Sequence, residues 1–357
     1  MLPPSSSNNF KNILVCGGSG FMGSHFVGHL YHTYPSYRVF NLDLLTYAGN
    51  NANIRDIELH KAGVPLDGQR YHFIHGDICD RGLLEELFRA HAFASVLNFA
   101  AESHVDRSII SSVDFIRTNI YGVHALMEMV RKYSIPQFIQ ISTDEIYGDV
   151  PDGYSHEESP IRPSNPYSAS KAGADVLVQA FIRTHRVPAI IVRSSNNFGP
   201  FQYPEKLIPL AITSFLEGKK IPVHGQGQHV RSWIYVKDFC DAVDTIMHTA
   251  PRYTIWNISA GNLRTNLEVI HRIADLLGKD PKPHIEHIGD RPGADHRYAV
   301  DHAKLHRELG WAPKHNFDAA LGETVRWYQM NQEWWKRIKE ADTFRLHYEK
   351  QSKAQYY

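Results

Sequence analysis

Tyr167 and Lys171 stand four residues apart in the segment NPYSASK, which spans residues 165–171. Proline suits the first turn of a helix, and an i, i+4 spacing brings two side chains onto one helix face, about 6 Å apart. A lysine cation at that distance stabilises phenolate and lowers the pKa of tyrosine by roughly 1 to 3 units. The pair therefore predicts a tyrosine that takes a proton from a hydroxyl group, although this spacing also occurs by chance in many helices.

Two adjacent carboxylates, Asp144 and Glu145, follow a predicted strand that ends at Ser142 and Thr143. The hydroxyl of Thr143 can hold the same substrate oxygen that Tyr167 deprotonates. Two carboxyl groups in different environments of one cleft can divide the work of a general acid and a general base. Such a pair can also merely cap a turn. Beside a reactive tyrosine, however, we expect Asp144 and Glu145 to be acid and base.

A GxxGxxG turn lies between an apolar strand and an amphipathic helical segment. Glycine permits a tight turn and close approach of a phosphate, and the helix N-terminus offers unpaired N–H groups and a positive dipole end. The residues expected around a bound pyrophosphate are Gly17, Gly20, Phe21, Met22 and Gly23. Asp43 ends the next strand, where a carboxylate binds the adenosine ribose hydroxyls and repels a 2′-phosphate. The pattern predicts NAD rather than NADP; the alternative is a turn that only packs helix on strand, with Asp43 as a cap.

Two later strand ends supply further candidates for cofactor binding. Asp77 and Ile78 follow the third strand and are expected near the adenine. Ala100 and Ala101 follow the fourth, where small side chains let the cofactor lie against the backbone. For Asp77, a capping role in its own loop is about as good an interpretation.

Short apolar strands alternate with helical segments through the first half of the chain. The predicted strands are 12–16, 38–42, 71–75, 95–99, 138–142 and 189–193, and the long helical patterns include 113–133 and 167–185. This alternation predicts an α/β fold with a Rossmann-type doubly wound parallel sheet, whose ligands bind at the carboxyl ends of the strands.

After residue 193 the alternation breaks around a helical segment at 206–217, which indicates a smaller C-terminal α/β substrate lobe. We expect residues 1–193 to form the NAD-binding domain. The chain is expected to return to that domain at about 231–262, with strands at 231–236 and 254–258. Residues 194–230 and 263–357 then form the lobe that binds the second ligand.

Composition excludes several classes of function. The 38 basic and 38 acidic side chains leave a formal net charge of zero, so no global field attracts nucleic acid. Cys16, Cys79 and Cys240 are isolated and odd in number, which favours a reducing compartment over a disulfide framework. We expect no secretory leader, no bilayer-spanning segment and no metal site, because the apolar runs are short and the 22 histidines show no metal-site spacing. These features predict a cytoplasmic enzyme without membrane or nucleic-acid partners.

Six segments together closely resemble the extended short-chain dehydrogenase/reductases and, within them, the dTDP-glucose 4,6-dehydratases. They are AESHVDRSI at 101–109, STDEIYG at 142–148, YSASK at 167–171, SNNFGPFQ at 195–202, PEKLIP at 204–209 and DRPG at 290–293. The resemblance runs from about Lys11 to Trp335. It implies NAD-dependent conversion of dTDP-glucose to dTDP-4-keto-6-deoxyglucose and water, in a homodimer formed by long helices of the NAD domain.

The resemblance also implies individual roles. Tyr167, backed by Lys171, takes the proton of the sugar 4-hydroxyl while a hydride passes to NAD. Glu145 then removes the C5 proton, and Asp144 protonates the departing C6 hydroxyl. The residues expected to contact or lie near the nucleotide sugar are Ser103, Thr143, Asn196, Lys206, Arg231, Asn266 and Arg291, with Ser103 also near NAD. Their types fit, because arginine and lysine neutralise phosphate and asparagine gives directional hydrogen bonds.

A few positions depart from the pattern usual in this family, all expected on the nucleotide side. They are Gln226, Ser232 and Ala294. The donor therefore stays open between dTDP-glucose and a UDP sugar such as UDP-glucose or UDP-N-acetylglucosamine. Two other functions stay open: a nucleotide-sugar 4-epimerase, which has no use for Asp144 and Glu145, and a non-catalytic NAD sensor, in which the tyrosine or lysine is commonly lost.

Overall fold

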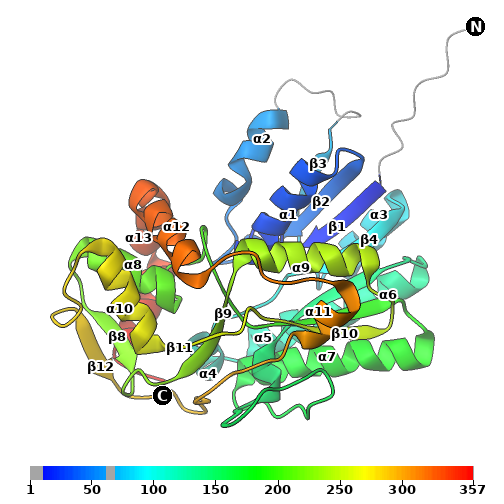
Figure 1. Cartoon of the computed structure of the whole chain (residues 1–357). Helices are drawn as coiled ribbons and strands as arrows, with labels where there is room; N and C mark the ends of the chain where they lie inside the picture. The colour runs from blue at the N-terminus through cyan, green and yellow to red at the C-terminus, as the bar shows by residue number, and fades with distance from the viewer. Residues whose placement is uncertain (1–10, 62–68, 357) are drawn as a thin grey trace, which may run out of the picture.

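A seven-stranded sheet in the order β10-β6-β5-β4-β1-β2-β3 forms the centre of the molecule (Figure 1). The computed structural model describes residues 11–61 and 69–356. The strands are β1 (Lys11–Cys16), β2 (Tyr37–Asp43), β3 (Tyr71–His75), β4 (Phe93–Asn98), β5 (Phe138–Thr143), β6 (Ala189–Ser194) and β10 (Thr254–Ile258). Every neighbouring pair in this sheet is parallel. The predicted Rossmann-type α/β fold is confirmed.

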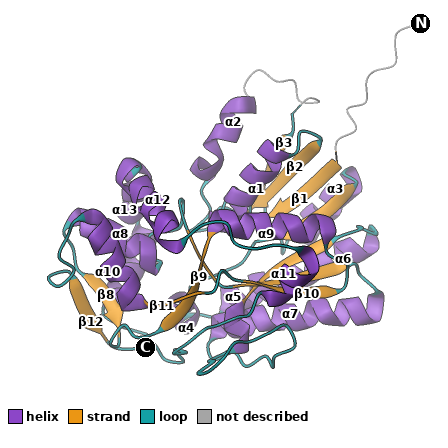
Figure 2. Cartoon of the chain, viewed as in Figure 1, coloured by secondary structure: helices purple, strands orange, loops and turns teal. Residues whose placement is uncertain are grey.

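Helices cover both faces of this sheet (Figure 2). The helices are α1 (Phe21–Thr33) and α9 (Val236–Thr249) on one face, and α3 (Arg81–Ala90), α6 (Val123–Lys132) and α7 (Pro166–His185) on the other. Successive side chains of a strand point to opposite faces. Ile13 and Val15 of β1 accordingly join the core under α1 and α9, whereas Leu14 and Cys16 join the core under α3, α6 and α7.

The helix predicted at 113–133 is divided into three pieces. They are α5 (Val113–Ile116), the π-helical turn η3 (Arg117–Gly122) and α6. The π turn carries Asn119, whose side-chain amide donates to Glu102 O at 3.0 Å and to Ser170 Oγ at 2.8 Å. The wide turn thus ties the loop after β4 to α7. The remaining short elements of this half are η1 (Asn51–Ile54), α2 (Arg55–Lys61), α4 (Val105–Ile110) and η4 (Asp144–Tyr147).

A smaller lobe of two short sheets and several helices lies beside the carboxyl ends of the central strands (Figure 1). Its strands are β7 (Asn196–Phe198), β8 (Ile221–His224), β9 (Val230–Tyr235), β11 (Asn262–Thr265) and β12 (Ile285–Ile288). Its helices are α8 (Leu207–Glu217), α10 (Asn266–Leu277), α12 (Phe317–Met330), α13 (Gln332–Glu340) and α14 (Asp342–Ser352), while α11 (Ala303–Leu309) packs near β10. None of the described helices is long and apolar enough to cross a membrane.

One strand prediction is wrong. Residues 231–236 were expected to rejoin the central sheet together with 254–258, but only the latter, as β10, does so. β9 pairs with β7 and, in antiparallel register, with β11, which follows it in the chain only after α9 and β10. The division of the chain at residue 193 and at 231–262 stays a prediction.

Candidate active site

The glycine turn and the ends of β2, β3 and β4 surround a pocket, named the turn pocket below. The predicted cofactor residues in its wall are Gly17, Gly20, Asp43, Asp77, Ile78, Ala100 and Ala101. Thr46, Gly49 and Thr118 also line it, and no sequence pattern indicated them. Carboxyl ends of parallel strands and one helix N-terminus therefore meet at a single site, as a dinucleotide requires.

The glycines are needed for the shape of the turn. Gly17 has φ +77°, and a Cβ on it would lie 2.5 Å from the backbone N of Ala100. A Cβ on Gly23 would lie 2.1 Å from Gly17 O. Helix α1 starts directly after the turn, and the first N–H groups of a helix have no partner within it. Phe21 and Met22 supply such groups, so the turn fits a pyrophosphate.

Asp43 at the end of β2 holds the turn and faces the pocket. Its Oδ2 accepts a hydrogen bond from Ser19 N at 2.9 Å, and its Oδ1 accepts one from Leu45 N at 2.8 Å. Burial raises the pKa of Asp43, whereas the two N–H donors oppose the rise. Since a carboxylate has about four acceptor sites, it can still accept a ribose hydroxyl. The residues of the turn pocket therefore fit NAD.

Asp77 caps its own loop in the structure. Its Oδ1 accepts a hydrogen bond from Cys79 N at 2.8 Å, which caps the loop, and its Oδ2 lies 2.6 Å from Arg117 Nη2. The residue also lines the turn pocket. The capping carboxylate is thus part of the wall of the turn pocket, and its contact with the adenine stays a prediction.

Helix α7 carries Tyr167 and Lys171 on its buried face. The helix begins with a capping box of Asn165 and Ser168, followed by proline at the first position. The ammonium of Lys171 donates to Ile141 O of β5 at 2.7 Å. Burial lowers the pKa of Lys171 to about 8.

The expected effect of Lys171 on Tyr167 is not found. Burial raises the pKa of Tyr167 well above its ordinary value, Glu145 raises it further, and a hydrogen bond with Thr143 opposes the rise. The ammonium of Lys171 donates to the carbonyl of Ile141, and Lys171 is not among the groups that shift the pKa of Tyr167. A pKa raised in this way keeps Tyr167 a neutral phenol at neutral pH.

Thr143, Asp144 and Glu145 form the link between β5 and η4. Thr143 caps η4 by accepting a hydrogen bond from Glu145 N at 3.3 Å. Burial raises the pKa of Asp144 to about 8, with a further rise from Glu145. Burial also raises the pKa of Glu145, but Arg231 and Lys206 lower it. The two carboxyls therefore differ: Asp144 keeps its proton at neutral pH, and Glu145 faces cations.

A second pocket, named the lobe pocket below, opens between the lobe and the central sheet. The predicted residues in its wall are Ser103, Glu145, Asn196, Lys206, Arg231, Asn266 and Arg291. Further wall residues that were not predicted include His104, Glu205, His224, Asp295, Tyr298 and Gln351. Thr143, Asp144 and Tyr167 are buried and are not among the residues that line this pocket. Most of the predicted substrate residues thus meet, although they come from segments far apart in the sequence.

The loop after β4 separates the two pockets. Ala101 and Glu102 line the turn pocket, and the next residue, Ser103, lines the lobe pocket. Lys206 Nζ donates to Ser103 O at 2.8 Å, and Asn119 clamps Glu102 from the other side. A cofactor in one pocket and a substrate in the other would therefore share this wall. Asn119 was not predicted, because its role depends on the π turn.

Both arginines of the lobe pocket are held by fixed partners. Arg231 donates to Val230 O at 2.8 Å and to Asp295 O at 3.0 Å, and its guanidinium lies 4.2 Å from the ring centroid of Tyr298. Arg291 Nη2 donates to Asp106 Oδ2 at 2.9 Å. These partners orient two cations toward one cavity, which suits a diphosphate.

The family departures do not all face the lobe pocket. Ala294 lines it, but Gln226 is exposed and lies outside its wall. Ser232 is buried, and its hydroxyl bonds Ser259 Oγ at 2.8 Å. Of the three departures from the family pattern, only Ala294 therefore changes the wall of the pocket expected to hold the nucleotide.

A Rossmann-type sheet with a glycine turn, a strand-end threonine and a tyrosine four residues before a lysine defines the extended short-chain dehydrogenase/reductase class. The family model described as GDP-mannose 4,6 dehydratase matches residues 14–324. A dTDP-glucose 4,6-dehydratase of Neisseria gonorrhoeae is 45% identical, over 90% of this chain and 96% of that protein.

Solved structures agree. A dTDP-glucose 4,6-dehydratase of Bacillus anthracis in complex with NAD is 43% identical with a TM-score of 0.84, covering 92% of this chain and 100% of that one. A dTDP-glucose 4,6-dehydratase of Streptomyces venezuelae with NAD bound is 40% identical with a TM-score of 0.86, at the same coverage. The chain therefore belongs to the nucleotide-sugar 4,6-dehydratases, the NAD-dependent lyases that include the dTDP-glucose 4,6-dehydratases.

Proposed function

We propose that this enzyme converts dTDP-glucose to dTDP-4-keto-6-deoxyglucose and water, with NAD as a retained cofactor. The observation that carries the proposal is the pair of unlike carboxyls beside Tyr167. Burial raises the pKa of Asp144 to about 8, so it holds a proton to give. Glu145 lines the lobe pocket among cations, which favour its ionised form as a base.

When bound, NAD supplies the hydride acceptor and the later hydride donor, together with a positive ring that favours phenolate. Thr143 and Tyr167 hold the 4-hydroxyl of the sugar, and Tyr167, as the phenolate that a bound cofactor would favour, accepts its proton. The resulting 4-keto group acidifies the C5 proton, which a carboxylate oxygen of Glu145 removes. Asp144 gives its proton to the departing C6 oxygen, so water leaves. A proton then returns to C5, while the hydride taken from C4 would be returned to C6, so the sugar is not oxidised overall and NAD is regenerated. Lys171 alone does not lower the pKa of Tyr167, but in this proposal its charge adds to that of the bound nicotinamide ring, and the two together would favour the phenolate.

The same pocket explains how the nucleotide would be held. We assign Arg231, Arg291 and Lys206 to the diphosphate, because they bring the positive charge of the lobe pocket together. Asn196 Oδ1 is buried without a hydrogen-bond partner among the described residues, and it faces the same pocket, so it is available to a ligand donor. The alternatives are a UDP-glucose or UDP-N-acetylglucosamine 4,6-dehydratase and, less well supported, a 4-epimerase.

The test is mass spectrometry of the products formed in heavy water from dTDP-glucose, UDP-glucose and UDP-N-acetylglucosamine, each incubated separately. Loss of water with one deuterium gained on the dTDP sugar supports the proposal. If only a UDP sugar shows this change, the dehydration is supported but dTDP-glucose is not the substrate. No mass change on any sugar leaves the epimerase or the NAD sensor.

Glu145→Gln supplies the matched variant. We expect it to lose turnover by at least about 100-fold, because general acid–base groups contribute 10² to 10⁴ in rate. Exposed Glu158→Gln is the control and should keep the wild-type rate. Full turnover of Glu145→Gln would contradict the assigned mechanism.

We further infer a homodimer formed by the helices beside the NAD site. Large apolar side chains are exposed on α4, α5, η3 and α7, namely Ile110, Val113, Ile116, Tyr121 and Val176. Adjacent exposed apolar residues mark an interaction face. Analytical ultracentrifugation should show a dimer of the wild type and a monomer of Ile116→Glu/Val176→Glu; a monomeric wild type would contradict the inference.

We also infer a cytoplasmic location. Cys16, Cys79 and Cys240 are buried free thiols. Unpaired cysteines are typical of reducing compartments. Fractionation of the producing cell tests this: recovery outside the cytoplasm would contradict it.

A further inference from the structure

The C-terminal helix α14 forms part of the lobe pocket. The family match ends at residue 324, so α14 lies outside it. Phe344, His347 and Gln351 are its buried residues, at the i, i+3 and i+7 positions of one helix face. Gln351 reaches the wall of the pocket. In Figure 1 the chain ends beside the lobe.

Gln351 is bonded to a residue that holds a pocket arginine. Its Nε2 donates to Asp106 Oδ2 at 3.1 Å and to Glu205 O at 3.4 Å. Asp106 is fully buried and pairs with Arg291, whose Nε lies 2.6 Å from Oδ1 and whose Nη2 donates to Oδ2 at 2.9 Å. Two of the three guanidinium nitrogens thus face the carboxylate of Asp106, the Tyr356 hydroxyl also interacts with this ion pair, and the Arg291 side chain lines the lobe pocket.

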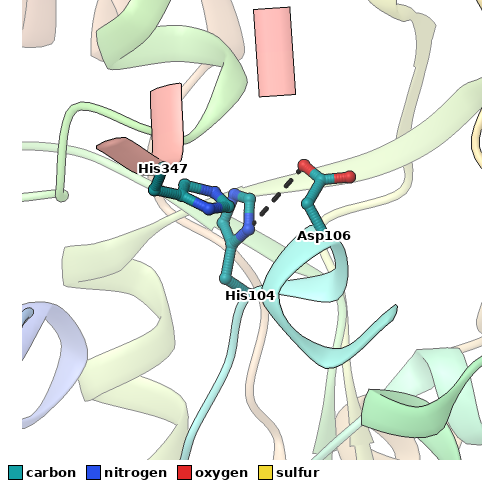
Figure 3. A group of neighbouring side chains, drawn as sticks. All are labelled: His104, Asp106 and His347. Atoms are coloured by element: carbon teal, nitrogen blue, oxygen red, sulfur yellow. Dashed lines mark ion pairs between the residues drawn. The ribbon is translucent and has the colours of Figure 1, made fainter. Parts of the chain in front are cut away.

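Two histidines, His104 and His347, pack near Asp106 and enclose its ion pair with Arg291. The rings of His104 and His347 pack edge to face, with centroids 4.8 Å apart. In Figure 3 the Asp106 carboxylate points toward His104. His104 Nδ1 lies 3.7 Å from Asp106 Oδ2. The three side chains are close enough to bind a metal ion, but both carboxylate oxygens of Asp106 already face the cation of Arg291. A second cation there would be repelled, so the cluster is better explained as a packed support for the arginine.

We propose that Gln351 is a positioning residue for nucleotide-sugar binding, which fixes Asp106 and through it directs Arg291 at a nucleoside diphosphate in the lobe pocket. The inference rests on the proposed function for the identity of the ligand. Losing the amide removes one of the hydrogen bonds that hold Asp106, and the buried ion pair gains freedom to move. Helix α14 then contributes to substrate affinity without touching the reacting carbons.

The test compares Gln351→Ala with Lys350→Ala, an exposed neighbour on the same helix. Calorimetric titration with dTDP and, separately, UDP measures binding without catalysis. We expect Gln351→Ala to weaken the diphosphate that the wild type binds by roughly 10-fold. Lys350→Ala should match the wild type.

Two further readouts separate positioning from general loss of structure. For Gln351→Ala, KM for the nucleotide sugar should rise by a similar factor while kcat stays within about 2-fold, and the Kd for NAD should not change. If this variant does not fold, Gln351→Glu, which keeps the length but repels Asp106, replaces it and should weaken binding at least as much.

The outcomes are distinct from those of the proposed function. Unchanged dTDP and UDP affinity in Gln351→Ala overturns the inference even if the wild type dehydrates dTDP-glucose. Equal weakening of NAD and diphosphate binding also overturns it, because that indicates a general structural role. Selective weakening of UDP alone supports the inference while overturning the proposed donor.

Discussion

Thr143 donates its side-chain hydroxyl to Asp144 Oδ1 at 3.4 Å, a long hydrogen bond. Asp144 Oδ2 is buried, and no group in the described part of the chain bonds it. A carboxylate that loses water and gains so little in return is disfavoured relative to the neutral acid. This geometry explains why burial raises the pKa of Asp144 to about 8 and why a proton is stored beside the substrate pocket.

Asp144→Asn should stabilise the protein at alkaline pH. The pKa of Asp144 is raised from 3.8 to about 8 on folding, so the native state binds the proton more tightly than the unfolded chain. Stability from this group is therefore full below about pH 4 and is lost as pH rises to about 8. Thermal unfolding should show the Tm of the variant gaining roughly 3 °C or more on the wild type between pH 5 and 8.5.

Exposed Asp152→Asn is the matched control for this measurement and should show no such trend. A Tm difference between Asp144→Asn and wild type that is the same at pH 5 and 8.5 would contradict the raised pKa.

The dehydration rate should fall above about pH 8. Asp144 must be protonated and Lys171 charged, and burial places the pKa of each at about 8. Glu145 must be ionised, and since burial raises its pKa, the acid limb should lie above pH 4.5. Steady-state kcat/KM from pH 5 to 10 gives the profile. Arginine stays charged at alkaline pH, so Lys171→Arg should still lose activity above about pH 8 if deprotonation of Asp144 causes the loss. A wild-type rate that stays constant up to pH 10 would contradict the roles given to both Asp144 and Lys171.

Asp43→Asn should weaken NAD binding and reduce discrimination against NADP. An asparagine cannot accept with both side-chain atoms, so one bond to Ser19 N or Leu45 N is lost, at a cost of about 1 to 3 kcal/mol. Loss of the negative charge also removes repulsion of a 2′-phosphate. Titration with both cofactors should show the NAD affinity falling by roughly 10-fold and the NADP affinity falling less or rising.

Asp80→Asn is the control for Asp43→Asn, because Asp80 caps α3 outside the turn pocket and asparagine is an equally good cap. Its cofactor affinities should match the wild type. An unchanged NAD-to-NADP ratio in Asp43→Asn would show that this carboxylate does not select the cofactor.

Asp175→Ala should strongly destabilise the fold. Arg193 of β6 is buried and donates to both oxygens of Asp175 in α7, at 2.9 Å each. Removing the carboxylate leaves a buried guanidinium uncompensated, which costs about 3 to 5 kcal/mol. Urea unfolding measures the loss. Asp175→Leu/Arg193→Met, which removes both charges, should recover most of it; a double variant no more stable than Asp175→Ala would argue against an ionic cause.

Local sequence patterns were sufficient to predict much of the fold and most of the residues that form the site. The alternating strands, the glycine turn and the Tyr167–Lys171 spacing depend on periods of a few residues, so each is readable in the chain. The carboxyl ends of parallel strands must meet at one edge, and for that reason Asp43, Ala100 and Thr143 could be assigned to one region before their positions were known.

Other features depend on distant partners. No local sequence period predicts the π turn that directs Asn119 toward Glu102, and none predicts the pairing of β9 with β11. Ser232 was expected on the nucleotide side, but it is buried and bonds Ser259, which follows β10 and is distant in the sequence.

The sequence by itself determined which chemical groups this protein carries and near which strand ends they lie, because strand and helix periods are local. Only the tertiary structure decided their chemical state. Burial depends on the whole chain, and it raises the pKa of Asp144 to about 8 and keeps Tyr167 a neutral phenol. The packing of α7 on β5 likewise places the ammonium of Lys171 at Ile141 O. The spacing of two residues in a helix cannot report how much water surrounds them.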